Sequence, residues 1–147
     1  MQNNEKIQKE LTVVLSTTYS LLIKTQNFHW NVEGAGFYSL HKLFEEQYQN
    51  LSKAVDTIAE RLRALGFRAP ASMGEFLKHT LISENQKATH SKDMLKELIE
   101  SHQIIESFLR NSLKNINEDP VTEDLFLERL SFHENSRWFL SMESKKS

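Results

Sequence analysis

The sequence predicts an all-α protein with four long helices in a single domain spanning residues 1–147. Four glycines and two prolines among 147 residues are too few for a loop-rich or all-β chain. Four long segments also repeat their apolar residues at intervals of three and four, the spacing of an amphipathic helix with one buried face. No segment has a convincing strand pattern, and no internal repeat divides the chain.

The first two helices are predicted to form a pair joined by a glycine turn. Residues from about 7 to 31 place one stripe on a single face: Leu11, Val14, Leu15, Thr18, Leu21, Leu22, Thr25 and Phe28. Gly34 and Gly36 end this pattern, because glycine weakens a helix and permits sharp turns. A second helix is expected from about residue 38 to 65, with Gly66 where a left-handed C-terminal cap belongs.

A long connection containing a short helix is predicted before the third long helix. Ser72 and Glu75 have the spacing of a capping box, which opens a short helix at residues 76–79. The third long helix is expected over residues 87–114. The fourth is expected to begin at Thr122, after the polar connection 115–120, and to continue through Leu125, Leu130, Phe139 and Leu140.

Composition excludes several kinds of site and partner. The chain contains no cysteine, so disulfides, thiolate metal sites and cysteine nucleophiles are excluded. The first residues lack the apolar stretch of a signal peptide, and no window has the length of a membrane span, so a cytoplasmic protein without a membrane partner is expected. The net charge of −2 gives no general attraction to nucleic acid.

Two pairs of potential metal ligands lie on the second predicted helix. His41 and Glu45 are four residues apart, as are Asp56 and Glu60, so the members of each pair share one helical face. His29 lies near the end of the first helix. Because imidazoles and carboxylates suit iron, manganese or zinc, these five residues are candidate ligands.

Distance decides how the two pairs are used. His41 and Asp56 lie about 22 Å apart on a continuous helix, at about 1.5 Å per residue. A metal site is far smaller than this, so the two pairs cannot serve one metal within a subunit. They meet if two copies of the helix pack antiparallel across a two-fold axis, which forms two sites per dimer.

A metal site inside one bundle is disfavoured. The usual di-iron arrangement uses Glu-x-x-His pairs, but the positions three residues before the histidines hold Gln26, Tyr38, Phe76, Lys87, Ile99 and Leu130. On spacing alone, the five candidates fit solvated surface residues and a core histidine as well as they fit a metal site. The other histidines lack partners at ligand spacing and are interpreted as surface or structural residues: His79, His90, His102 and His133.

Residues 27–48 closely resemble the signature of the Dps family of miniferritins. They match its His-Trp, the following glycine, the Phe, the Leu-His pair and the Phe-Glu-x-x-Tyr ending. Asp56, Glu60 and Arg61 continue the pattern, and His133-Glu134 followed by Trp-Phe is similar to the family's last helix. The resemblance covers nearly the whole chain and implies a ferritin-like four-helix bundle with a short helix between the second and third long helices.

The resemblance implies iron storage and detoxification in a dodecamer built from dimers. The implied activity is that of a ferroxidase, an oxidoreductase that oxidises Fe(II), preferably with hydrogen peroxide, and stores ferric mineral, which protects against oxidative damage. The family's ligands map onto His29, His41 and Glu45 of one subunit and onto Asp56 and Glu60 of its mate, with Glu60 as the bridging candidate. Position 45 departs from the family pattern, which has aspartate there.

The resemblance also suggests how iron enters the shell. Asp119, Asp124 and Glu128 fall around the start of the fourth helix, where the family lines a three-fold acidic pore, although ordinary acidic residues at a helix start are about as well supported. Trp30 follows a ligand directly and is interpreted as packing rather than as a radical trap. Glu46 is one of several acidic candidates for nucleating the mineral.

DNA binding is expected to be weak or absent. Some family members bind DNA through a lysine-rich tail, whereas Lys145 and Lys146 are too few for strong phosphate neutralisation. Two other interpretations stay open. One is a helical assembly protein with a degenerate metal site, which the intact ligand set disfavours. The other is a cell-surface or immune-stimulating family member that acts through its outer surface.

Overall fold

The computed structural model describes residues 2–84, 87–116 and 118–145, which form four long helices and one short helix. The helices are α1 (Gln2–Asn31), α2 (Phe37–Ala64), α3 (Met73–His79), α4 (Ser91–Leu113) and α5 (Pro120–Ser144). No strand occurs in these three ranges, so the predicted all-α bundle is confirmed.

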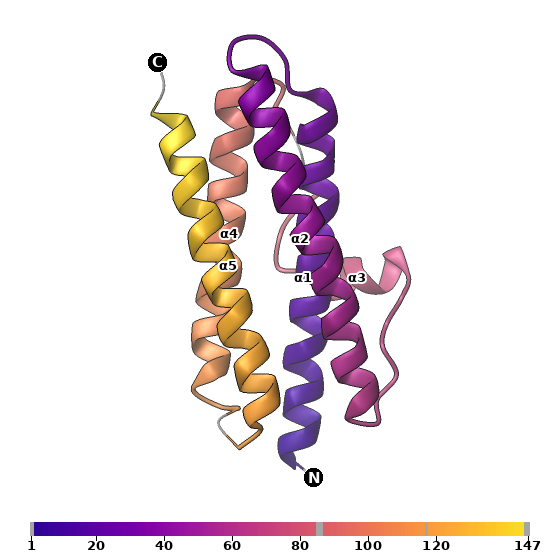
Figure 1. Cartoon of the computed structure of the whole chain (residues 1–147). Helices are drawn as coiled ribbons and strands as arrows, with labels where there is room; N and C mark the ends of the chain where they lie inside the picture. The colour runs from indigo at the N-terminus through magenta and orange to yellow at the C-terminus, as the bar shows by residue number, and fades with distance from the viewer. Residues whose placement is uncertain (1, 85–86, 117, 146–147) are drawn as a thin grey trace.

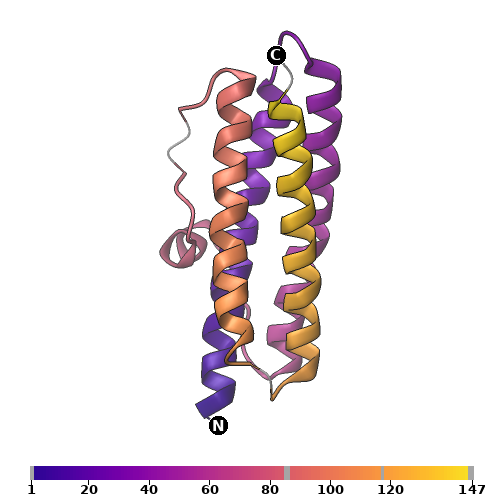
Figure 2. The same cartoon turned by 90° about the vertical axis from the view of Figure 1, so that its left-hand side faces the viewer.

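The long helices form two antiparallel hairpins that pack together as a bundle. α1 packs along α2, α4 packs along α5, and the two hairpins meet through α1 with α4 and α2 with α5 (Figure 1). The short helix α3 lies against α1, outside the bundle. The chain after α3 then runs back alongside α4, so α4 begins near the end of the bundle that carries the α1–α2 turn (Figure 2).

Glycines with positive φ angles shape the ends of α2. Gly36 precedes the helix at a φ of 82°, and Gly66 follows it at a φ of 93°. Side chains rarely adopt this left-handed backbone, whereas glycine enters it without a steric cost. The expected glycine turn and the expected left-handed cap are therefore both confirmed.

Four helices begin at residues other than those predicted. α1 begins at Gln2 rather than near residue 7, and α3 begins at Met73 rather than at residue 76. α5 begins at Pro120 rather than Thr122, because Asp119 caps it by accepting a hydrogen bond from the Thr122 amide and proline is well suited to the first helical position. α4 begins at Ser91 rather than near residue 87. The Ala88 amide instead donates to the Glu97 carboxylate at 3.1 Å, which holds the preceding segment outside the helix.

The core consists of two apolar clusters at opposite ends of the bundle. One is built around Leu11, Ile58, Ile105 and Phe126, and the other around Leu21, Phe44, Leu98 and Leu140. Phe139 on α5 lies outside both clusters and is 43% exposed in the single subunit.

Buried polar residues separate the two clusters on three of the long helices. We call these residues the polar layer: Ser16, Thr17 and Thr18 on α1, Ser101 and His102 on α4, and His133 and Ser136 on α5. Thr18 satisfies its hydroxyl by donating to the Val14 carbonyl one turn earlier, at 2.6 Å. In the described part of the chain, no helix combines the length and apolar character needed to cross a membrane.

Candidate metal site

The α1–α2 turn brings His29 and His41 together. His29 is in the last turn of α1 and His41 in the second turn of α2, so the antiparallel hairpin places their rings side by side. The ring centroids are 3.8 Å apart and the planes differ by 15°. Two imidazoles predicted from sequence as ligands are thus in contact.

Reciprocal hydrogen bonds fix the orientation of both rings. His29 Nδ1 lies 2.7 Å from the His41 carbonyl oxygen, and His41 Nδ1 lies 2.7 Å from the His29 carbonyl oxygen. A carbonyl oxygen only accepts, so each Nδ1 carries the proton and donates. The Nε2 lone pairs are therefore left to bind a metal, and a partner that fixes the other ring nitrogen is typical of metal-binding histidines.

Glu45 completes a group of three potential ligands. It lies one turn after His41 on α2, and one ligand atom from each of His29, His41 and Glu45 falls within 4.8 Å of the others. The Glu45 carboxylate also lies 3.8 Å from Lys42 Nζ and accepts a hydrogen bond from Gln49 at 3.4 Å. Two neutral imidazoles and a carboxylate form a donor set suited to iron, manganese or zinc.

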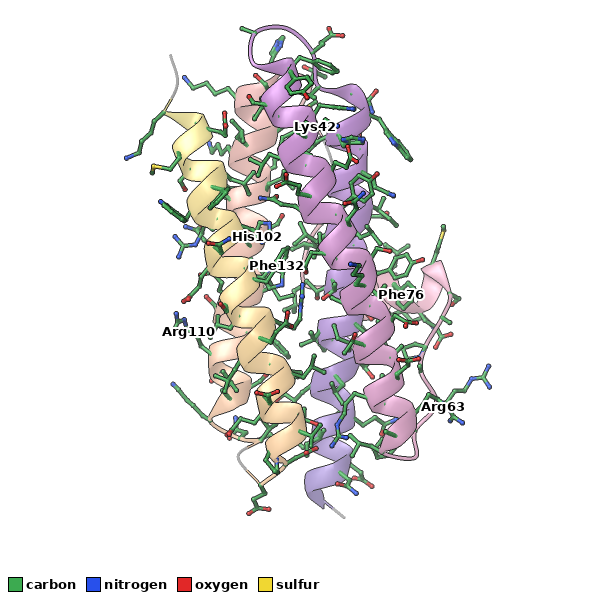
Figure 3. The ribbon with its side chains drawn as sticks, viewed as in Figure 1. Lys42, Arg63, Phe76, His102, Arg110 and Phe132 are labelled. Atoms are coloured by element: carbon green, nitrogen blue, oxygen red, sulfur yellow. The ribbon has the colours of Figure 1, made fainter. Side chains whose placement is uncertain are left out.

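Aromatic side chains border this group. Phe37 stacks on the His41 ring with centroids 5.0 Å apart, and Tyr48 meets the His29 ring edge-on at 5.2 Å. Trp30, by contrast, is 68% exposed, so the expectation that it packs is not met within the single subunit. Lys42 lies at the same end of the bundle (Figure 3).

Asp56 and Glu60 are not brought to the histidines within the subunit. Both are exposed on α2, and Asp56 lies about 22 Å along the helix from His41. They nevertheless share a stripe with the other candidate ligands of α2. At about 100° per residue, His41, Glu45, Asp56 and Glu60 lie at about 0°, 40°, 60° and 100° around the axis. This helix therefore presents all four side chains toward one side.

The three predicted pore residues separate into two groups. Asp124 and Glu128 are exposed and line a groove of about 620 Å³ between α2 and α5, together with Glu60. Asp119 lies outside this groove and is engaged in the fold. Its carboxylate accepts two hydrogen bonds from Arg61, at 2.9 and 3.0 Å, and caps α5.

The Asp119 carboxylate is held in its charged form. Burial favours the neutral acid, but hydrogen bonds from Thr122 and Arg61 outweigh it and lower the pKa of Asp119 below its ordinary value. Because the Asp119 carboxylate already accepts hydrogen bonds from Arg61 and from the start of α5, few of its oxygen lone pairs are free to bind a cation.

Sequence reasoning missed a contact between two buried histidines. His102 and His133 lie on α4 and α5, are fully buried, and approach to 2.9 Å through their Nδ1 atoms. The interpretation of His79 and His90 as surface residues agrees with their exposure. His102 and His133 are therefore structural residues of the core and not surface residues. Apolar residues at helical spacing along each helix were the sequence signal that could have indicated their burial.

Comparison with known proteins identifies the family. Residues 8–145 match the family model described as the ferritin-like domain. The chain is 36% identical over 124 residues to the DNA protection during starvation protein of Helicobacter pylori, with 82% of this chain and 85% of that protein covered. It is 29% identical to DNA protection during starvation protein 2 of Bacillus anthracis, with 93% and 95% covered.

Solved structures agree with this assignment. Dps from Thermosynechococcus elongatus superposes with a TM-score of 0.94 at 26% identity, covering 99% of this chain and 94% of that one. Antigen TpF1 from Treponema pallidum gives a TM-score of 0.92 at 30% identity, covering 99% and 95%. The chain therefore belongs to the ferritin-like proteins. Within them it is a member of the Dps miniferritins, and this membership supports a role in iron storage and protection.

Proposed function

We propose that the protein is a ferroxidase that oxidises Fe(II), preferably with hydrogen peroxide, and stores the ferric product in a dodecameric shell built from dimers. The observation that carries this proposal is the group formed by His29, His41 and Glu45, whose imidazoles already present Nε2 as the ligand atom. A structure of Dps from Vibrio cholerae is described as belonging to a superfamily of ferritin-like diiron-carboxylate proteins, which supports iron as the metal.

Three ligands from one subunit leave the site incomplete, and a second copy supplies the rest. Antiparallel packing of two α2 helices brings Asp56 and Glu60 of one copy to the histidines of the other. The shared stripe on α2 supports this arrangement, since every ligand of this helix lies on the same side. Two equivalent sites then form in each dimer.

The surface of α3 supports a subunit contact near this stripe. Met73 is 73% exposed, Leu77 is 52% exposed, and Leu81 after the helix is 41% exposed. Apolar side chains gathered on one short element are typical of a protein interface. α3 lies beside the α1–α2 hairpin, so a contact through α3 would bring a second copy close to α2 (Figure 1).

The proposed reaction takes one electron from each of two Fe(II) ions. Both electrons go to hydrogen peroxide, whose O–O bond breaks, and two protons complete two water molecules. The carboxylates of Glu45, Asp56 and Glu60 stabilise Fe(III) more than Fe(II), because anionic oxygen ligands favour the higher charge. Glu60 is the candidate that would bridge the two iron ions, and it also lines the groove that carries Asp124 and Glu128.

DNA binding is proposed to be weak or absent. Twelve copies with a net charge of −2 each give a shell charge of −24, which repels phosphate in the absence of bridging cations. Lys145 is exposed at the end of α5, and Lys146 lies outside the described residues.

The proposal is tested by loading the protein with Fe(II) under anaerobic conditions and adding hydrogen peroxide, with oxygen alone as the comparison. We expect fast peroxide-driven oxidation with the iron retained in a large soluble particle. Glu45→Gln should slow the reaction, whereas Glu5→Gln, an exposed residue in the first turn of α1 at the opposite end of the bundle, should leave it unchanged. Slow oxidation with precipitated iron in the unaltered protein would rule the proposal out.

A further inference from the structure

Two histidines that the proposed iron chemistry does not use lie in the polar layer. His102 on α4 lies about halfway along the bundle (Figure 3). His133 on α5 contacts it, and the two residues are here called the histidine pair. Both are fully buried, and the Phe132 ring packs edge-on against His102 at 6.2 Å between centroids. Solvent therefore has no direct access to either imidazole.

The hydrogen bond within the pair places a single proton between the two Nδ1 atoms. The Nδ1 atoms are 2.9 Å apart, so one ring donates and the other accepts. Each Nε2 is buried and has no hydrogen-bond partner among the described residues. The accepting ring must carry its own proton on Nε2, and the donating ring keeps a bare Nε2. Both rings are then neutral.

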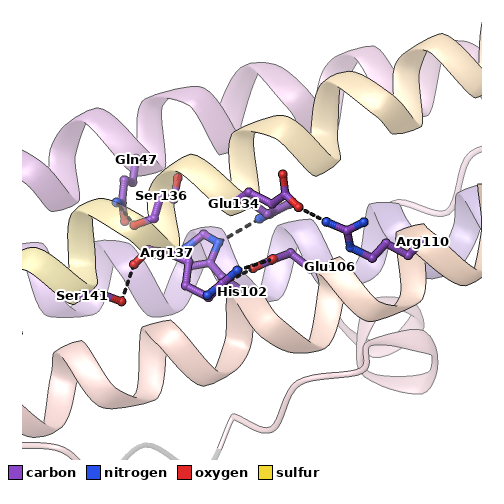
Figure 4. Close-up of polar contacts among 9 residues, drawn as sticks. Gln47, His102, Glu106, Arg110, Glu134, Ser136, Arg137 and Ser141 are labelled. Carbon is purple, nitrogen blue, oxygen red and sulfur yellow. Dashed lines mark hydrogen bonds and ion pairs between the residues drawn. The ribbon is translucent and has the colours of Figure 1, made fainter.

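The charged groups on α4 and α5 disfavour a positive charge on the pair. Arg129 and Arg137 on α5 both act on His102 electrostatically. Glu106, the buried acid on α4, is already engaged by Arg137 through two hydrogen bonds of 2.7 and 3.0 Å (Figure 4). Burial, reinforced by the two arginines, lowers the pKa of His102 to about 3. Burial also holds the pKa of His133 well below its ordinary value.

The charged groups on α1 and α2 do not offset the cost of a positive charge on the histidine pair. On α1, the buried ammonium of Lys24 lies 3.2 Å from the Ser101 hydroxyl, next to His102 in sequence, and its acidic neighbour Glu97 is 4.0 Å away. On α2, the buried polar residue at this level is the uncharged Gln47, which donates a weak hydrogen bond of 3.5 Å to the Ser136 carbonyl. Arg129 likewise has an acidic partner of its own, Glu128, at 3.6 Å. The carboxylates near the pair are thus engaged by basic groups, and among the described residues none is hydrogen bonded to either imidazole.

Protonation disrupts the pair in two stages. The first added proton goes to the bare Nε2, which creates a buried imidazolium beside Arg129 without an acceptor for its new N–H. The second goes to the accepting Nδ1, which then points an N–H at the N–H of the other ring. The hydrogen bond between α4 and α5 is replaced by a repulsive contact.

We propose that the histidine pair is an acid-sensitive latch: protonation of its buried imidazoles opens the four-helix bundle and with it the assembled shell. The unfolded chain binds these protons at the ordinary pKa of 6.5, whereas in the folded protein the pKa of His102 is about 3 and the pKa of His133 also lies well below its ordinary value. At a pH between the folded and the unfolded pKa values, the unfolded state binds protons that the folded state does not bind. The contribution of the pair is therefore complete above pH 6.5 and is lost as the pH falls.

The test uses the full chain without iron, titrated from neutral pH into acid. Far-ultraviolet circular dichroism reports the helices, and sedimentation reports the assembly. The double variant His102→Gln/His133→Gln keeps polar side chains that can hydrogen bond to each other but cannot be protonated. The matched control is His79→Gln/His90→Gln, which removes two exposed histidines.

We expect the midpoint of acid unfolding in the His102 and His133 variant to move about one pH unit or more toward acid, with no shift in the control. Equal midpoints in the variant and the unaltered protein would overturn the proposal. Exchange of the imidazole C2 proton, followed by mass spectrometry in the unaltered protein, gives an answer even if the variant does not fold. His102 and His133 should show no titration while the assembly is intact, and a pKa near 6.5 in the folded state would refute the latch.

Discussion

Mixing two inactive variants tests whether the iron site is shared between subunits. The first variant is His29→Asn/His41→Asn, because the asparagine amide can take over the hydrogen bond that each Nδ1 donates while removing the Nε2 ligand. The second is Asp56→Asn/Glu60→Gln, which keeps the shape of both side chains and removes their charge. Each variant alone should oxidise Fe(II) only at the background rate.

The fraction of the oxidation rate that the mixture should recover follows from the distance between the two ligand pairs along α2. Since His41 and Asp56 lie about 22 Å apart in one subunit, each site must combine residues of two copies. Equal amounts refolded together give mixed dimers in about half of the cases. Each mixed dimer holds one site with every ligand and one site that keeps only Glu45. About one quarter of all sites should therefore be intact.

The assay is peroxide-driven formation of ferric absorbance after anaerobic loading with Fe(II). The refolded mixture should reach about one quarter of the rate of the unaltered protein. Sedimentation must first show that both variants and the mixture assemble alike. If the assembled mixture oxidises Fe(II) no faster than the average of the two variants, the site lies within one subunit. The argument from the distance along α2 is then refuted.

Three further predictions concern the fold and the groove. Gly36→Ala should lower the free energy of unfolding by about 1–2 kcal/mol, because Gly36 has a positive φ that alanine adopts only with strain. Gly74 lies inside a helix, so Gly74→Ala should raise the free energy of unfolding by about 0.5–1 kcal/mol. Chemical denaturation measures both changes. Asp119→Ala should cost about 1–2 kcal/mol at neutral pH relative to an Asp124→Ala control. Since the folded pKa of Asp119 is lowered, this difference should persist above the ordinary value of 3.8 and shrink as the pH falls through the folded value; an unchanged difference in acid would contradict the assignment. Replacing Asp124 and Glu128 by their amides should slow iron uptake in stopped-flow measurements, and unchanged uptake kinetics would remove both residues from the path of the iron.

The sequence was sufficient to predict the helices, because their buried faces repeat with the period of an α-helix. Thr18 and Thr25 were correctly placed in the buried stripe of α1, where each hydroxyl donates to a carbonyl one turn earlier. The start of α5 was wrong because Asp119 and Pro120 were read as a connection, although an acidic cap followed by proline is also a helix beginning.

The candidate site was only partly predictable in the same way. Spacing on α2 identified Glu45 as a neighbour of His41, since both lie on one helix. The contact between His102 and His133 joins two helices and depends on their relative height, which no periodic pattern contains. Exposure of Trp30 was missed for a related reason, because its position at the end of α1 does not reveal which surface a second copy covers.

The polar layer fixes the position of the helices along the bundle axis, and with it the position of their ends. If α1 moved by one turn, about 5.4 Å, its buried Thr17 would lose the hydrogen bond that it accepts from the Leu81 amide at 3.0 Å, and the buried polar residues of α1 would move toward an apolar cluster. The same movement would pull His29 away from the His41 carbonyl, which is only 2.7 Å from its ring. The height at which α1 ends is thus set in the middle of the molecule, and the position of the outermost imidazole is determined by residues that never touch it.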